Sequence, residues 1–229
     1  MLDTYHRSGE CLCCHQSIDE DISSENNLIF EEETDTRRKV VKYKRYYNDE
    51  RDDFVVIPRT WQGKEVYSAA ENAFKDNKNI GTVAITEKVT YIDDYAFSNC
   101  TYLVNVYLAN VSSIDSYAFS SCTSLAQITL SDTINIKGEH AFDGAGLTNI
   151  NLKNISIIRE HAFANCSSLR SVDFSSSGIT ELPDFIFKNC TSLDNVSIPS
   201  TANIIKDGAI EGCTQLKKIF ISVSVTYIV

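Results

Sequence analysis

The stretch that decides the fold is IDDYAFSNCTYLVNVYL, Ile92–Leu108, because the chain repeats it. The frame returns as IDSYAFSSCTSLAQITL (Ile114–Leu130), IIREHAFANCSSLRSVDF (Ile157–Phe174) and, more loosely, LPDFIFKNCTSLDNVSI (Leu182–Ile198). One apolar residue marks the register at intervals of 21 to 24 residues: Phe74, Phe97, Phe119, Phe142, Phe163, Phe187 and Ile210. A fixed period in this range predicts a solenoid, in which stacked units share one core.

Each repeat contains a short apolar-x-apolar segment, such as Val106–Leu108. Side chains alternate in direction along a strand, so this pattern predicts a strand whose first and third residues enter the core. An acidic residue stands three positions before the marker, as Asp94 does before Phe97. Carboxylates favour the start of a helical turn, so a short helical turn is expected over each marker segment. We therefore interpret the acidic row as structural and not as a set of catalytic carboxylates.

Five of the eight cysteines follow a marker by three residues: Cys100, Cys122, Cys166, Cys190 and Cys213. Stacked repeats would place them in one row, where cysteine serves as a small buried hydrophobic residue. We expect free thiols there. Together with the absence of a recognisable signal sequence at the N-terminus, this favours a cytoplasmic location, or a nuclear one if the basic run Arg37–Arg45 is a localisation signal.

The part of the chain before the repeats divides in two. Residues 1–25 lack periodicity and are expected to be mobile. Their cluster Cys11, Cys13, Cys14 and His15 lacks the second ligand pair of a structural zinc site, so we expect exposed thiols. Residues 26–53 alternate charged blocks with short apolar runs, which predicts an antiparallel β cap over the first repeat. The solenoid, with about seven repeats, then occupies residues 54–229.

The frame AF-xx-C-xx-L-xx-I-x-L, with Ile-Pro closing the strands at Ile57 and Ile198, closely resembles the BspA-type leucine-rich repeat. The resemblance implies an α/β solenoid: an arc with a concave parallel β-sheet, short helical turns opposite, and the N-terminal β cap. It also implies an interaction or adhesion protein, often at the cell surface in this family. One repeat departs from the pattern, because DGAGLTNINL (Asp143–Leu152) shortens the link and has Ala145 in place of cysteine.

Outward-facing strand residues are the candidate partner-binding set. They are rich in amides and hydroxyls, with aromatic residues towards the ends, which suits a polypeptide partner. The set is Asn105, Tyr107, Gln127, Thr129, Asn149, Asn151, Ser171, Asp173, Asn195, Ser197, Lys218 and Phe220. The net charge of −10 and the few basic residues in this set disfavour nucleic acid. No apolar run is long enough for a membrane span.

Two further patterns suggest other roles. Lys39, Val41 and Tyr43 match a basic-x-Val-x-aromatic docking string typical of protein phosphatase-1 partners, so a regulatory subunit of that phosphatase is the alternative function. His140 and His161 should stack in adjacent repeats, as a ladder of planar side chains or as zinc ligands; we favour the ladder and expect no metal.

No catalytic motif is present, so no enzyme activity and no cofactor are expected. Ile219–Val229 reads as one strand followed by an uncapped end, which predicts either a chain cut short here or end-to-end homodimerisation through the last repeat.

Overall fold

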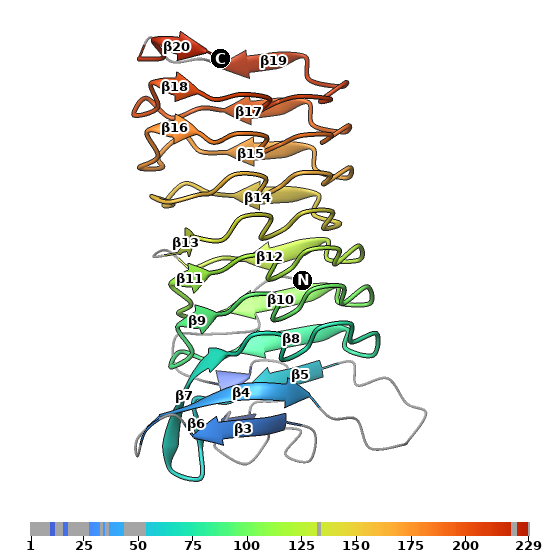
Figure 1. Ribbon diagram of the computed structural model, residues 1–229, viewed down its shortest axis with the longest axis vertical. Helices are drawn as coiled ribbons and strands as arrows, with labels where there is room; N and C mark the ends of the chain where they lie inside the picture. The colour runs from blue at the N-terminus through green and yellow to red at the C-terminus, as the bar shows by residue number, and fades with distance from the viewer. Residues whose placement is uncertain are drawn as a thin grey trace.

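The computed structural model describes residues 10–11, 16–17, 28–32, 34, 37–43, 54–131, 134–220 and 224–228. The repeats coil into turns that stack along the long axis of the molecule (Figure 1). A typical turn contributes one longer and one shorter strand, so two rows of strands run along the stack. The solenoid expected from the repeat is confirmed.

The longer strands pair in parallel, as the repeat predicts. They form two four-stranded sheets, ordered β5-β8-β10-β12 reading from the N-terminal end and β14-β15-β17-β19. The strands are β5 (Phe54–Ile57), β8 (Thr82–Ile85), β10 (Asn105–Leu108), β12 (Gln127–Thr129), β14 (Asn149–Asn151), β15 (Ser171–Asp173), β17 (Asn195–Ser197) and β19 (Lys218–Phe220).

A second row of parallel strands was not expected from the sequence. Its members are β7 (Lys64–Ala69), β9 (Tyr91–Ile92), β11 (Ser113–Ile114), β13 (Asn135–Ile136), β16 (Glu181–Leu182), β18 (Ile204–Ile205) and β20 (Tyr227–Ile228). Most of these strands have two residues, too few to show the alternation on which strand prediction rests. Only their single core residues, such as Ile92 and Ile114, stand out in the sequence.

The N-terminal end of the second row carries an antiparallel hairpin. Strands β3 (Leu28–Glu32) and β4 (Arg37–Tyr43) pair with each other, and β4 also pairs in parallel with β7. Strand β6 (Thr60–Trp61) adds to β7 from the side, and the ring of Trp61 stacks on Phe30 at 4.6 Å. The expected mobile segment 1–25 lies outside the described residues, apart from the antiparallel pair β1 (Glu10–Cys11) and β2 (Gln16–Ser17).

The expected helical turns are wrong: the described residues contain no helix, so the fold is a β-solenoid and not an α/β one. Every second backbone N–H group in the marker segment donates a hydrogen bond to the next repeat. The N–H groups of Tyr95, Phe97 and Asn99 donate to carbonyl oxygens of Ser116, Ala118 and Ser120, at 2.8–2.9 Å. These groups cannot then close a helix, and the left-handed φ angles of Tyr95 (56°) and Asn99 (59°) break it as well.

One carboxylate of the acidic row acts between repeats. The carboxylate of Asp94 accepts the backbone N–H of Ser116 in the following turn, at 2.7 Å. It therefore ties two neighbouring turns together and does not start a helix in its own turn. Asp94 thus has a structural role, as expected, but it bonds to the next turn instead of starting a helix.

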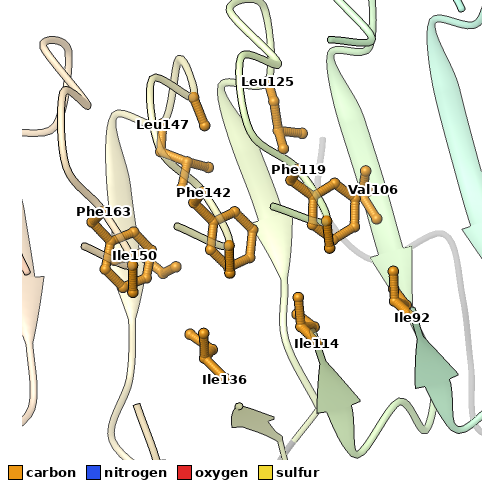
Figure 2. Close-up of a cluster of buried hydrophobic side chains, with 14 of the residues drawn as sticks. Ile92, Val106, Ile114, Phe119, Leu125, Ile136, Phe142, Leu147, Ile150 and Phe163 are labelled. Atoms are coloured by element: carbon orange, nitrogen blue, oxygen red, sulfur yellow. The ribbon is translucent and has the colours of Figure 1, made fainter. Parts of the chain in front are cut away.

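The core is a ladder of marker rings with aliphatic residues from both rows around it (Figure 2). Phe97, Phe119, Phe142 and Phe163 stack at centroid distances of 5.2–5.3 Å, and all four are fully buried. The five repeat cysteines lie beside this ladder as free thiols, as expected; four are buried and Cys213 is half-buried. Stacked rings and aliphatic contacts give the solenoid one continuous core.

The C-terminal segment contains two strands, where the sequence predicted one. β19 continues the row of longer strands, and β20 pairs in parallel with β18 at the end of the shorter row. Tyr227 and Ile228 in β20 are 62% and 61% exposed. The expected homodimer through this repeat stays a prediction.

Candidate protein-interaction surface

The candidate residues lie in two columns on the outward face of the longer strands. Strand register places Asn105 beside Gln127 and Tyr107 beside Thr129. After the break between the two sheets, the columns continue as Asn149, Ser171, Asn195 and Lys218, and as Asn151, Asp173, Ser197 and Phe220. The alternation that predicted these columns is therefore correct in register. We call this face the outward columns.

Exposure along the outward columns is uneven. Gln127, Thr129, Asn149, Asn151 and Asn195 are exposed, whereas Asn105, Tyr107, Ser171, Asp173 and Ser197 are half-buried. In the Tyr107 column the equivalent positions in β5 and β8 are closed: Val56 is 6% exposed and Ala84 3%. In the Asn105 column they are open, because Phe54 is 45% exposed and Thr82 is half-buried. The Tyr107 column is thus accessible from β10 onwards, and the Asn105 column from β5 onwards. The side chains of Lys218 and Phe220 lie outside the described part of the chain.

Several outward side chains are held in place by their neighbours. The hydroxyl of Ser171 donates to the Asn149 side-chain oxygen at 2.8 Å. The Asp173 carboxylate accepts the backbone N–H of Ser175 at 2.9 Å and pairs with the Lys153 ammonium at 3.1 Å. The Ser175 N–H, more than Lys153, holds the pKa of Asp173 below its ordinary value. This part of the face therefore presents ordered polar groups and few uncompensated charges.

The phosphatase-docking string lies inside β4. Lys39 is paired with Glu31 of β3 on one side and Ser68 of β7 on the other, and Tyr43 is paired with Leu28. The side chains of Val41 and Tyr43 lie outside the described residues. A docking string must be available as an extended segment, and this one is already used in a sheet. The phosphatase hypothesis gains no support from this arrangement.

His140 and His161 form part of a ladder of stacked planar rings. Tyr95, Tyr117, His140, His161 and Phe185 follow one another at centroid distances of 4.4–5.0 Å. His140 Nδ1 also lies 2.8 Å from an Asp143 carboxylate oxygen. Among the described residues, no cluster of three or more His, Cys, Asp or Glu side chains could hold a metal ion. The ladder that the sequence favoured is confirmed.

The break between β12 and β14 is a feature that sequence reasoning missed. It lies within the outward columns, between Thr129 and Asn151, where the repeat register alone predicts a continuous sheet. The sequence did contain a sign of this break, because the repeat that follows β12 has the shortened link Asp143–Leu152. What could not be foreseen is that both rows of strands would be interrupted at this repeat.

Comparison with known proteins agrees with this architecture. The family model described as "BspA type Leucine rich repeat region" matches residues 54–169 and 138–229 with six copies. No curated protein shows a significant match. Among the residues that the structure describes, no helix could cross a membrane.

Two solved structures show the same fold. A leucine-rich repeat protein from Bacteroides ovatus superposes with a TM-score of 0.77 at 24% identity; the match covers 88% of this chain and 54% of that one. The T. pallidum leucine-rich repeat protein gives a TM-score of 0.65 at 22% identity, covering 89% and 84%. The chain thus spans about half the length of the Bacteroides protein.

Proposed function

The chain belongs to the BspA-type leucine-rich repeat family, and from this membership we propose that it is a non-enzymatic module that binds another protein through its outward columns. Proteins of this family are typically scaffolds without catalytic activity. The observation that carries the proposal is the register of the longer strands, which arranges amide and hydroxyl side chains and the Tyr107 ring in two columns. Such a face offers donors and acceptors to a polypeptide, with Tyr107 as an anchor.

The charge of the face supports a protein partner over a nucleic acid. Among the described side chains of the outward columns, Asp173 and Tyr107 are the ionisable ones. The Asp173 carboxylate is paired with the Lys153 ammonium. Phosphate binding requires a concentration of lysine and arginine that these columns lack. Neutral hydrogen-bonding groups suit a surface that recognises backbone and side-chain amides.

The family also favours a cell-surface location over the cytoplasmic one expected from the sequence. That expectation rested partly on reduced cysteines. Four thiols are buried and donate to phenylalanine carbonyl oxygens at 3.0–3.1 Å: Cys100, Cys122, Cys166 and Cys190. Because burial shields them from oxidants, they can stay free in an oxidising compartment as well as in a reducing one. Adhesion through the outward columns is therefore the form of protein binding that we favour.

The experiment is affinity capture of a partner from the native source, followed by titration of the purified partner against variants. Tyr107→Ala and Asp173→Lys should each weaken binding at least tenfold, the loss typical of an interface anchor. Tyr91→Ala is the matched control, because Tyr91 is 41% exposed on the shorter row. Equal binding by all three variants would contradict a role for the outward columns.

A further inference from the structure

The longer row begins with an exposed aromatic residue on its outward face. Phe54 opens β5, the N-terminal strand of this row (Figure 1), and is 45% exposed. Strand register pairs Phe54 with Thr82, and Thr82 with Asn105. Side chains alternate along a strand, and Val55 and Ile57 are fully buried, so Phe54 lies on the outward face. Phe54 is therefore the first member of the Asn105 column, although it lies outside the set expected from the sequence.

The residue before each longer strand forms a rim along the Asn105 column, and this rim changes in polarity. Beside β8 the rim residue is Gly81. One turn later it is Val104, whose N–H donates to the Gly81 carbonyl oxygen at 2.7 Å and which is 41% exposed. Beside β15 and β17 the rim residues are Arg170 and Asp194, and both are exposed. The N-terminal end of the outward columns is thus apolar, and the part beyond β14 is polar and charged.

Phe54 and Tyr107 can be covered by one partner. Because Val56 and Ala84 close the Tyr107 column at β5 and β8, a partner reaches Phe54 along the Asn105 column, past Thr82. Phe54 and Tyr107 are two strands and two residues apart, which is about 12 Å from the usual strand spacing and rise. An interface of ordinary size, about 800 Å² on each partner, is wide enough to cover both.

We propose that Phe54 is a second anchor for the protein partner of the outward columns, and that the partner places an apolar side chain against it. An aromatic ring gains free energy by leaving water, and aromatic residues dominate the binding energy of protein interfaces. The amide and hydroxyl groups from Asn105 onwards then bind polar groups of the same partner. The change from an apolar to a polar end fixes the direction in which the partner lies. The inference rests on the proposed protein-binding function and adds a residue that decides the partner's orientation.

The first test places a photo-crosslinker on the full chain. The crosslinking amino acid p-benzoylphenylalanine replaces Phe54, Tyr107 or, as the control, Tyr227, which is 62% exposed on the shorter row. Each protein is irradiated in an extract of the native source, and the crosslinked proteins are identified by mass spectrometry. Positions 54 and 107 should capture the same protein, and position 227 should not capture it. Capture at position 107 without position 54, or equally at position 227, would overturn the role of Phe54.

The second test titrates the protein captured at position 107, after purification, against variants of Phe54. Phe54→Ala should weaken binding about tenfold, the loss expected for one aromatic anchor, and Phe54→Leu should lose less because it keeps an apolar side chain. Tyr227→Ala should bind like the wild type, and circular dichroism checks that each variant is folded. Binding by Phe54→Ala equal to that of the wild type would overturn the second anchor. The proposed function itself fails only when Tyr107→Ala and Asp173→Lys also bind like the wild type.

Discussion

The thiol of Cys122 donates a hydrogen bond to the carbonyl oxygen of Phe97 in the preceding turn, with 3.1 Å between Sγ and oxygen. Cys100, Cys166, Cys190 and Cys213 do the same for Phe74, Phe142, Phe163 and Phe187. The Cys row is thus a set of ties between turns as well as a row of small core residues. Each of these carbonyl oxygens also accepts a backbone N–H within its own turn, as Phe97 does from Cys100 at 3.2 Å.

Thiol reactivity should follow depth in the solenoid. Burial raises the pKa of Cys166 well above its ordinary value, that of Cys190 to about 12, and that of Cys213 to about 11. Only the thiolate reacts with maleimide. In a background with Cys11, Cys13 and Cys14 replaced by serine, we expect the native chain at pH 8 to label slowly and at Cys213 first. Mass spectrometry of the labelled chain checks this, and rapid labelling of Cys166 before unfolding would contradict it.

Truncation of one core ring should be costly. Phe119 is fully buried between Phe97 and Phe142, so Phe119→Ala should lower the free energy of unfolding by about 3–5 kcal/mol. Val104→Ala is the control, because Val104 is 41% exposed and its truncation should change stability by less than about 0.5 kcal/mol. Urea denaturation followed by circular dichroism measures both. Similar losses in the two variants would argue against the ring ladder as the core.

The shortened turn should depend on glycine at position 146. A Cβ atom there would lie 2.1 Å from the Thr123 carbonyl oxygen, a backbone atom that cannot move away. Gly146→Ala should therefore destabilise the chain by about 1–3 kcal/mol or more. At Gly178 the nearest atom to a new Cβ is the mobile Ser156 hydroxyl at 3.1 Å, so Gly178→Ala should cost less. Thermal unfolding of the two variants decides the order.

Asp93 should make stability depend on pH. Burial raises its pKa and Asp115 adds to the rise, while the Ser68 hydrogen bond, at 3.0 Å, and Lys39 oppose it. A raised carboxyl pKa means that the folded chain binds the proton more tightly than the unfolded chain. The contribution of Asp93 to stability therefore improves as pH falls from neutral through the folded pKa towards 3.8.

The variant that checks this is Asp93→Asn. It should be more stable than wild type at pH 7, with a difference that shrinks towards pH 4, because the amide carries no charge to desolvate. Asp207→Asn, at an exposed carboxylate, is the matched control. Denaturant unfolding between pH 4 and pH 7 measures the slope; a difference that grows towards pH 4 would contradict the assignment.

Much of this architecture is visible in the sequence because the repeat is nearly regular. The marker phenylalanines, the cysteine row and the outward columns all follow from register and alternation. The second row of strands could not be found in this way, since Ser113–Ile114 offers two residues and no period. The turns were mistaken for helical ones because an acidic residue before an apolar one, as at Asp94, suits both a helix start and a tie to the next repeat.

The candidate site was foreseen in part. Alternation placed Tyr107 beside Thr129, and Asn151 beside Asp173, in the correct register. It could not show that Val56 and Ala84 are covered, or that the sheet parts between Thr129 and Asn151. Both depend on contacts between elements, which a repeat pattern does not encode.

The break between β12 and β14 also bears on how the molecule unfolds. In a repeat array, cooperativity comes from the coupling between adjacent turns. The missing strand pairs weaken that coupling beside β12. The stack of Phe119 on Phe142 at 5.3 Å and the hydrogen bond from the Phe119 N–H to the Ala141 carbonyl oxygen at 2.8 Å still join the two turns. The solenoid is therefore expected to melt as two blocks joined through the marker segments, and the first block ends at β12.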